Sequence, residues 1–160
     1  MQHTISILVD NKPGVLTRVT GLVARRGFNI ESLAVDTTED PRLSRVTLVM
    51  EADEVSIEQI NKQLHKLINV HKIIDLTGAD AIERELALFK VVAAPDKRNE
   101  IVEVASLFRA NIVDVSQNAL VVEATGTHDK LQALEDLLRP YGIKEIVRTG
   151  KIALSRGAKE

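Results

Sequence analysis

The sequence predicts an α+β fold made of two successive β-α-β-β-α-β units. Stretches in which apolar residues alternate, as in half-buried strands, are interleaved with stretches of helical apolar spacing. The order strand, helix, strand, strand, helix, strand occurs once before residues 78–80 (Gly-Ala-Asp) and again after them. A chain of 160 residues has room for two small domains. Only 2% of the residues are aromatic, so each core must be built from Val, Ile, Leu and Ala.

The first unit is predicted over residues 1–78. Its alternating segments are expected to form four strands, at residues 4–9, 29–36, 43–51 and 70–77. A first helix is expected to begin at Pro13, which has no amide hydrogen to leave unpaired, and to end at Gly27. Ser56 and Gln59 resemble a capping box that opens a second helix, with apolar residues from Ile57 to Ile68.

This order of elements is the ferredoxin-like arrangement. Right-handed crossovers place both helices on one face of an antiparallel sheet, with the strand at 29–36 on its edge. The other face of the sheet must then be polar or covered by a partner.

The second unit is predicted over residues 79–160, with the same topology. Strands are expected at residues 85–93, 111–116, 119–124 and 143–148. One helix is introduced by Pro95, and another is capped by Thr127 and stopped at Pro140. The tail at 154–160 is expected to be loose.

Composition excludes several functions. A formal net charge of −2 argues against nucleic acid and anionic membranes as partners, and the strands at 29–36 and 43–51 lack the aromatic residues that stack RNA bases. The absence of cysteine excludes disulfides and thiolate catalysis, and is compatible with a reducing cytoplasm. No signal peptide and no membrane span are expected, so the predicted location is cytoplasmic.

Catalytic and metal sites are not expected either. The spacing of His65 and His71 is not typical of metal ligands, and we interpret both as surface or interface residues. No Ser-His-Asp arrangement with a nucleophile elbow is visible. Motif absence leaves an enzyme in its own right as an open alternative.

The segment from Asp10 to Leu16 (Asp-Asn-Lys-Pro-Gly-Val-Leu) joins the first strand to the first helix. The opening amides of a helix have no internal partner and lie at the positive end of its dipole, which suits a carboxylate. Gly14 allows another group to approach the backbone closely. The same residues also make an ordinary corner between a strand and a helix.

Asn29 opens the predicted edge strand directly after the first helix. An Asn there can simply complete the turn. If two copies join through this region, Asn29 of one copy could instead face the Asn11–Gly14 turn of the other. An amide side chain can bond both an ammonium and a carboxylate, which is the chemistry of a free amino acid.

Several stretches resemble one family along nearly the whole chain. They are residues 11–18 (Asn-Lys-Pro-Gly-Val-Leu-Thr-Arg), 26–33 (Arg-Gly-Phe-Asn-Ile-Glu-Ser-Leu), 40–45 (Asp-Pro-Arg-Leu-Ser-Arg), 63–67 (Gln-Leu-His-Lys-Leu) and 154–157 (Leu-Ser-Arg-Gly). In these stretches the sequence closely resembles the small, regulatory subunits of acetolactate synthase, also called acetohydroxyacid synthase. The Asn-Ile-Glu-Ser-Leu and Asp-Pro-x-Leu-Ser-Arg blocks together are specific, whereas Pro-Gly-Val-Leu alone is generic for ACT domains, a class of amino-acid sensors.

The resemblance implies an effector-binding, dimerising ACT domain at 1–78, a ferredoxin-like regulatory domain at 79–160, and a homodimer. It implies feedback inhibition by valine, often with leucine or isoleucine, in branched-chain amino-acid biosynthesis. The effector would lie where two ACT domains meet, on residues that correspond to Asn11, Gly14, Val15, Leu16, Asn29 and Ile30. Lys12 and Pro13 depart from the pattern, and we expect them to stiffen the loop.

The resemblance also implies that the chain has no catalytic site and binds no cofactor. It would activate a separate, catalytic large subunit that carries thiamine diphosphate, Mg and FAD. The alternative from another class is a stand-alone ACT-type sensor of amino acids that acts on a different partner.

Overall fold

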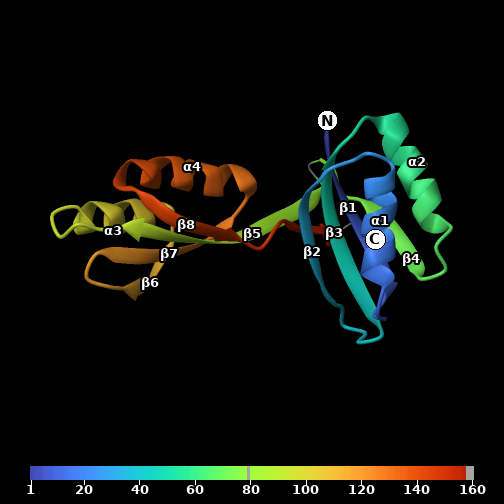
Figure 1. The fold of residues 1–160 in the computed structure, drawn as a ribbon, viewed down its shortest axis with the longest axis horizontal. Helices are drawn as coiled ribbons and strands as arrows, with labels where there is room; N and C mark the ends of the chain where they lie inside the picture. The colour runs from blue at the N-terminus through green and yellow to red at the C-terminus, as the bar shows by residue number, and fades with distance from the viewer. Residues whose placement is uncertain (79, 158–160) are drawn as a thin grey trace. The chain divides into compact units, whose positions relative to one another are not determined.

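The computed structural model describes residues 1–78 and 80–157, which form two compact units. The first unit is Met1–Ile82 together with the chain from Lys151 onward, and the second is Glu83–Gly150. In each unit two helices pack on one face of an antiparallel sheet (Figure 1). The predicted α+β class and the two ferredoxin-like units are therefore confirmed.

The first unit contains a four-stranded sheet in the order β2-β3-β1-β4. Its elements are β1 (Gln2–Asp10), α1 (Val15–Arg25), β2 (Ile30–Thr37), β3 (Leu43–Glu51), α2 (Glu54–His65) and β4 (Val70–Asp75). The strand order confirms that the strand after the first helix lies at a sheet edge. The aliphatic side chains of β1 and β3 that point to the helices, such as Ile7 and Leu48, are fully buried among those of α1 and α2.

Both helices of this unit begin differently from the prediction. Gly14 is the N-cap of α1, and Pro13 lies in the preceding turn rather than at the first helical position. For α2 the cap is Asp53, whose carboxylate accepts a 2.7 Å hydrogen bond from the Ser56 amide. The predicted capping box at Ser56 is wrong because a carboxylate three residues earlier caps the helix. The helix ends at His65, and Ile68, which was expected in its apolar stripe, is exposed.

The sheet face away from α1 and α2 is partly buried. Thr4, Ser6 and Thr47 alternate with the core residues and are nevertheless buried. On the same face, Ser32 Oγ accepts a 2.7 Å hydrogen bond from the amide of Lys151. The chain from Lys151 thus lies against this face of the first unit.

The C-terminal segment was predicted to be loose, and for Leu154 and Ser155 this is wrong. They belong to strand β9 (Ile152–Ser155), which pairs with β5 (Ala81–Val92). The amide of Arg156 then donates a 3.1 Å hydrogen bond to the carbonyl of Asp80. Sheet pairing satisfies backbone groups that a free tail would leave to solvent. Residues 158–160 lie outside the described part of the chain.

The second unit repeats the topology, with the strand order β6-β7-β5-β8. Its elements after β5 are α3 (Arg98–Leu107), β6 (Asn111–Val115), β7 (Ala119–Gly126), α4 (His128–Leu138), the short 3-10 helix η1 (Arg139–Tyr141) and β8 (Ile143–Arg148). Thr127 caps α4, as predicted, by accepting a hydrogen bond from the amide of Lys130. Phe89 and Leu134 are among the fully buried residues of its core.

The two units meet along the sequence inside β5, where the compact units divide between Ile82 and Glu83. The boundary expected between residues 78 and 79 stays a prediction, since Ala79 lies outside the described residues. Across residues 1–78 and 80–157, no helix combines the length and the apolar character needed to cross a membrane.

Candidate functional site

The loop between β1 and α1 is held in place by the turn between β2 and β3. The backbone amide of Asn11 donates to the carbonyl of Arg42 at 2.8 Å, and its side-chain Nδ2 donates to the carbonyl of Pro41 at 3.1 Å. The Asn11 side chain is exposed, and with its nitrogen bonded to the turn its Oδ1 is left as an acceptor. Asn11 is therefore positioned by the protein and still able to bond a ligand.

Gly14 adopts a left-handed backbone conformation with φ of +82°, which residues other than glycine rarely adopt. A Cβ at this position would have no heavy atom within 4 Å, so the space beside the backbone is open. The Val15 amide donates to the carbonyl of Lys12 at 3.4 Å. The next two amides, of Leu16 and Thr17, have no partner within the part of the chain that the structure describes. These free donors at a helix start can hold a carboxylate.

A second network fixes the base of this loop. Oδ1 of Asp10 lies 2.6 Å from Nε2 of His71, and its Oδ2 accepts a 2.8 Å hydrogen bond from Nδ2 of Asn69. Arg18, on the first helix, donates to Oδ1 of Asn69 at 2.9 Å. The hydrogen bond to His71, followed by that from Asn69, lowers the pKa of Asp10 below its ordinary value of 3.8. The network ties β4 and α1 to the residue that precedes Asn11.

Sequence reasoning missed this network. Asp10 and His71 are 61 residues apart and lie in no recognisable motif, so no local signal joins them. His71 is partly exposed, in agreement with its interpretation as a surface or interface residue. Its contact with Asp10 forms where the pairing of β1 with β4 is irregular, because Leu8 lies opposite Lys72 and Val9 opposite Val70, which leaves His71 outside the ladder.

The β2–β3 turn that carries Arg42 is braced internally. The guanidinium of Arg42 forms two hydrogen bonds with the carboxylate of Asp40, at 2.9 and 3.0 Å. These bonds, together with one from the Arg42 amide, lower the pKa of Asp40 to about 2. Asp40 is thus more than a solvated turn residue, because it positions the Arg42 backbone on which Asn11 rests.

Asn29 and Ile30 lie at the far end of the same unit. The C-cap of α1 is Arg26 rather than the predicted Gly27, which follows it with φ of +82°. Phe28 packs against the core, and Asn29 is exposed just before β2. In the sheet Ile30 pairs with Met50 on β3, whereas Asp10 pairs with Leu43. These two positions are seven residues apart along β3, which corresponds to about 24 Å. One chain therefore does not bring Asn29 and Ile30 together with the loop at Asn11–Leu16.

The edge strand β2 exposes apolar side chains on the sheet face that carries the helices, and helix α1 exposes another. Leu33 and Val35 pair with the buried Leu48 and Val46, yet they are 36% and 42% exposed. Leu16, in the first turn of α1, is 38% exposed. Apolar side chains on an edge strand, which has one side without a partner strand, favour association with another strand or helix.

The residues in the described ranges include no group of three or more His, Asp or Glu side chains that could hold a metal ion. The six predicted site residues fall into two groups. Asn11, Gly14, Val15 and Leu16 lie together at the loop between β1 and α1. Asn29 and Ile30 lie at the opposite end of the unit.

Comparison with known protein families defines the class. Residues 5–72 match the model described as the AHAS small subunit-like ACT domain, so the first unit is an ACT domain. Residues 84–157 match the model described as the small subunit of acetolactate synthase, which covers nearly all of the second unit.

Individual relatives extend the match over the whole chain. A probable acetolactate synthase small subunit of Archaeoglobus fulgidus is 56% identical over 100% of both chains. An acetolactate synthase small subunit of Mycobacterium bovis is 53% identical over 98% of this chain and 94% of its own length. The crystal structure of an acetolactate synthase small subunit from Thermotoga maritima superposes with a TM-score of 0.90 at 42% identity, covering 98% of each chain. The chain belongs to the family of acetolactate synthase small subunits.

Proposed function

We propose that this chain is a regulatory subunit that activates a separate, catalytic large subunit of acetolactate synthase and confers feedback inhibition by valine. One observation carries the proposal for the effector site. The two groups of predicted site residues lie at opposite ends of one sheet, so only a second copy of the chain can bring them together. An effector bound there acts on the arrangement of two chains.

The chemistry of the two groups is complementary to an α-amino acid. The free amides of Leu16 and Thr17 hold the carboxylate, and Oδ1 of Asn11 accepts from the ammonium group. Asn29 of the second copy bonds the same polar groups from the other side. A small branched side chain then packs against Leu16 of one copy and Ile30 of the other. The site thus comprises Asn11, Gly14, Val15 and Leu16 from one chain and Asn29 and Ile30 from its partner.

Inhibition follows when the effector binds at the interface between two chains. Valine shifts the equilibrium between two arrangements of the dimer only by its difference in affinity for them. A coupling of about 1–3 kcal/mol is typical of allosteric proteins. By linkage, the large subunit must weaken valine binding by the same factor by which valine weakens the active complex. Leu33 and Val35, exposed on the edge strand β2, supply the apolar surface for the homodimer.

Catalysis belongs to the partner in this proposal. The chain has no catalytic site and binds no cofactor, whereas the large subunit carries thiamine diphosphate, Mg and FAD. The pathway is the biosynthesis of valine, leucine and isoleucine, and the location is the cytoplasm.

Replacing Asn29 tests the site. Asn29→Asp places a carboxylate against that of valine, so calorimetry should show at least about a tenfold loss of valine affinity, equivalent to about 1.4 kcal/mol. Acetolactate formation by the large subunit should still be activated by this variant but should resist valine. Asn118→Asp, at an exposed turn of the second unit, is the matched control and should behave as the unchanged chain does. Normal valine binding by Asn29→Asp contradicts the site.

Copurification and activity of the isolated chain test the role. The chain should copurify with the large subunit and form no acetolactate from pyruvate by itself. Acetolactate formation by the isolated chain would show an enzyme in its own right. Valine binding without any association with the large subunit would instead show a stand-alone sensor.

A further inference from the structure

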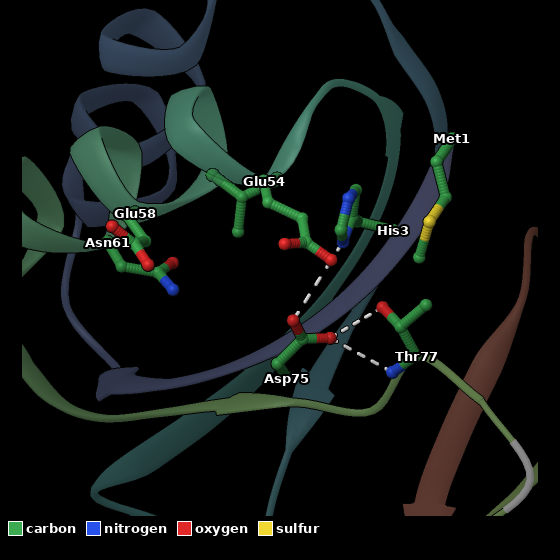
Figure 2. A pocket seen from close by; sticks show the side chains of 8 residues that line it. Met1, His3, Glu54, Glu58, Asn61, Asp75 and Thr77 are labelled. Carbon is green, nitrogen blue, oxygen red and sulfur yellow. Dashed lines mark hydrogen bonds and ion pairs between the residues drawn. The ribbon is translucent and has the colours of Figure 1, made fainter.

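The first unit contains a pocket near β4, at the sheet edge opposite to β2. It lies between α2 and the ends of β1 and β4, and has a volume of about 320 Å³ (Figure 2). Its lining residues are Met1, His3, Glu54, Ile57, Glu58, Asn61, Asp75 and Thr77. None of them belongs to the proposed effector site, which uses the β1–α1 loop and the start of β2. A volume of this order accommodates a small molecule.

The charges around this pocket favour a cation. Glu54 and Glu58 from α2 and Asp75 from β4 contribute three carboxylates, and no Lys or Arg is among the eight lining residues, all of which are described. The ammonium group of Met1 is paired with Glu51 at 2.6 Å. Converging carboxylates without a fixed counter-charge make the pocket electronegative.

Two buried polar groups at the pocket have no hydrogen-bond partner. The side chain of His3 is only 4% exposed, and neither of its ring nitrogens has a hydrogen-bond partner. Nδ1 of His3 lies 3.8 Å from Oδ2 of Asp75, which is too far for a hydrogen bond. Oδ1 of Asn61 is likewise buried without a donor. Buried polar atoms are nearly always hydrogen-bonded, so these two side chains indicate a place for a polar ligand.

Figure 2 shows how these groups are arranged. The ring of His3 and the carboxylates of Glu54 and Asp75 approach one another at one end of the pocket, and Glu58 and Asn61 lie together at the other. The carboxylate of Asp75 is oriented by Thr77, whose amide donates to Oδ1 at 2.9 Å. Acidic side chains are therefore present at both ends.

We propose that this pocket binds a small linear organic cation with an ammonium group at each end. Glu54 and Glu58 are four residues apart on one helix face, about 6 Å along its axis, which a diamine with a four-carbon spacer can span. Each ammonium group has three donors, enough for a carboxylate and for the acceptors of Asn61 or His3. A single metal ion does not fit, because the described residues contain no group of three acidic or histidine ligands that could hold one.

Titration of the full chain with 1,4-diaminobutane at constant ionic strength tests this site. Nuclear magnetic resonance should show saturable shifts of the His3 ring and the Asn61 side-chain amide. Butylamine, which has one ammonium group, should bind at least about tenfold more weakly, since a charge-assisted hydrogen bond is lost. The neutral 1,4-butanediol should cause no saturable shift.

Glu58→Gln supplies the second measurement. This side chain is exposed, so the variant should fold, and its affinity for 1,4-diaminobutane should fall about tenfold. The matched control is Glu103→Gln on α3, also exposed and remote from the pocket along the chain, which should not change the affinity. Three results overturn the proposal: absence of saturable shifts, equal binding of butylamine, or an unchanged affinity in Glu58→Gln. Equal shifts with Mg²⁺ at the same ionic strength also overturn it, because they indicate unspecific screening.

Discussion

Nε2 of His71 lies 2.6 Å from Oδ1 of Asp10, so that β4 holds the last residue of β1 directly before the loop that begins at Asn11. Asp10 is also bonded by Asn69, and its backbone amide donates to the carbonyl of the same Asn69 at 2.9 Å. The conformation of the proposed effector loop thus depends on a segment that touches no effector. His71 is a positioning residue in this sense.

His71→Ala should weaken valine binding by a few-fold without abolishing it. The variant loses one charge-assisted hydrogen bond to Asp10 at a partly exposed site, while the bond from Asn69 remains. Calorimetry measures the affinity, and His65→Ala, on an exposed turn of α2, is the matched control. If both variants bind valine equally well, the Asp10–His71 contact does not position the loop.

The stability of the first unit should depend on pH through Asp10. Its pKa is lowered below 3.8 in the folded state, mainly by the hydrogen bond to His71. The folded state therefore favours the ionised carboxylate. The resulting stabilisation is present above about pH 4 and is lost as the pH falls through the lowered pKa. Urea unfolding between pH 6 and pH 2.5 should show a smaller acid-side loss for Asp10→Asn than for Asp114→Asn, which removes an exposed carboxylate of β6. An equal loss in both variants would falsify this assignment.

Arg42→Ala should raise the pKa of Asp40 from about 2 toward its ordinary value of 3.8. The cause is the loss of the two side-chain hydrogen bonds from the guanidinium. Carbon-detected titration of the carboxyl group measures this change. Asp53 is the internal control, because its pKa is lowered by the amide of Ser56 and should not move. A pKa of Asp40 that stays near 2 in the variant contradicts the proposed cause.

Gly14→Ala should destabilise the chain by about 1 kcal/mol, because alanine is strained at a φ of +82° even though the space around it is open. Gly21→Ala is the matched control within α1. Its Cβ meets only the Arg25 side chain, at 3.5 Å, and alanine in a helix should stabilise the chain by up to about 1 kcal/mol. Urea unfolding measures the change in unfolding free energy, which should have opposite signs for the two variants. Equal effects would mean that Gly14 does not hold the left-handed conformation.

Arg148→Met should destabilise the second unit by about 2 kcal/mol, since it leaves two buried carboxylates with fewer partners. Arg148 lies 3.0 Å from Glu135 and 3.7 Å from Glu85, both of which are buried. The control is Lys90→Met, which breaks the exposed pair with Glu145 and should cost less than about 1 kcal/mol. Thermal and urea unfolding give both values, and similar costs would show that burial does not matter here.

Much of the fold could be predicted because its signals are local. Alternation placed the strand at 43–51 with the bounds that β3 has, and Thr127 was identified as the cap of α4. Errors arose where two local signals competed. Asp53 and Ser56 are both good caps, and Pro13 and Gly14 are both typical of a helix start. In the structure Asp53 and Gly14 occupy the N-cap positions.

For the candidate site too, the sequence predicts local features, whereas contacts between distant residues come from the tertiary structure. The sequence by itself determined the order of the elements, the edge position of β2 and the family to which the chain belongs, since periodicity and motifs need no distant contact. The tertiary structure alone decided that Asp10 meets His71 and that the chain from Lys151 lies on the first sheet. It also decided that Ile30 and Asp10 pair with positions about 24 Å apart along β3, which puts Asn29 and the loop at Asn11 at opposite ends of the sheet. Those relationships depend on strand register and on backbone pairing between residues far apart in the chain, which no local pattern of side chains encodes.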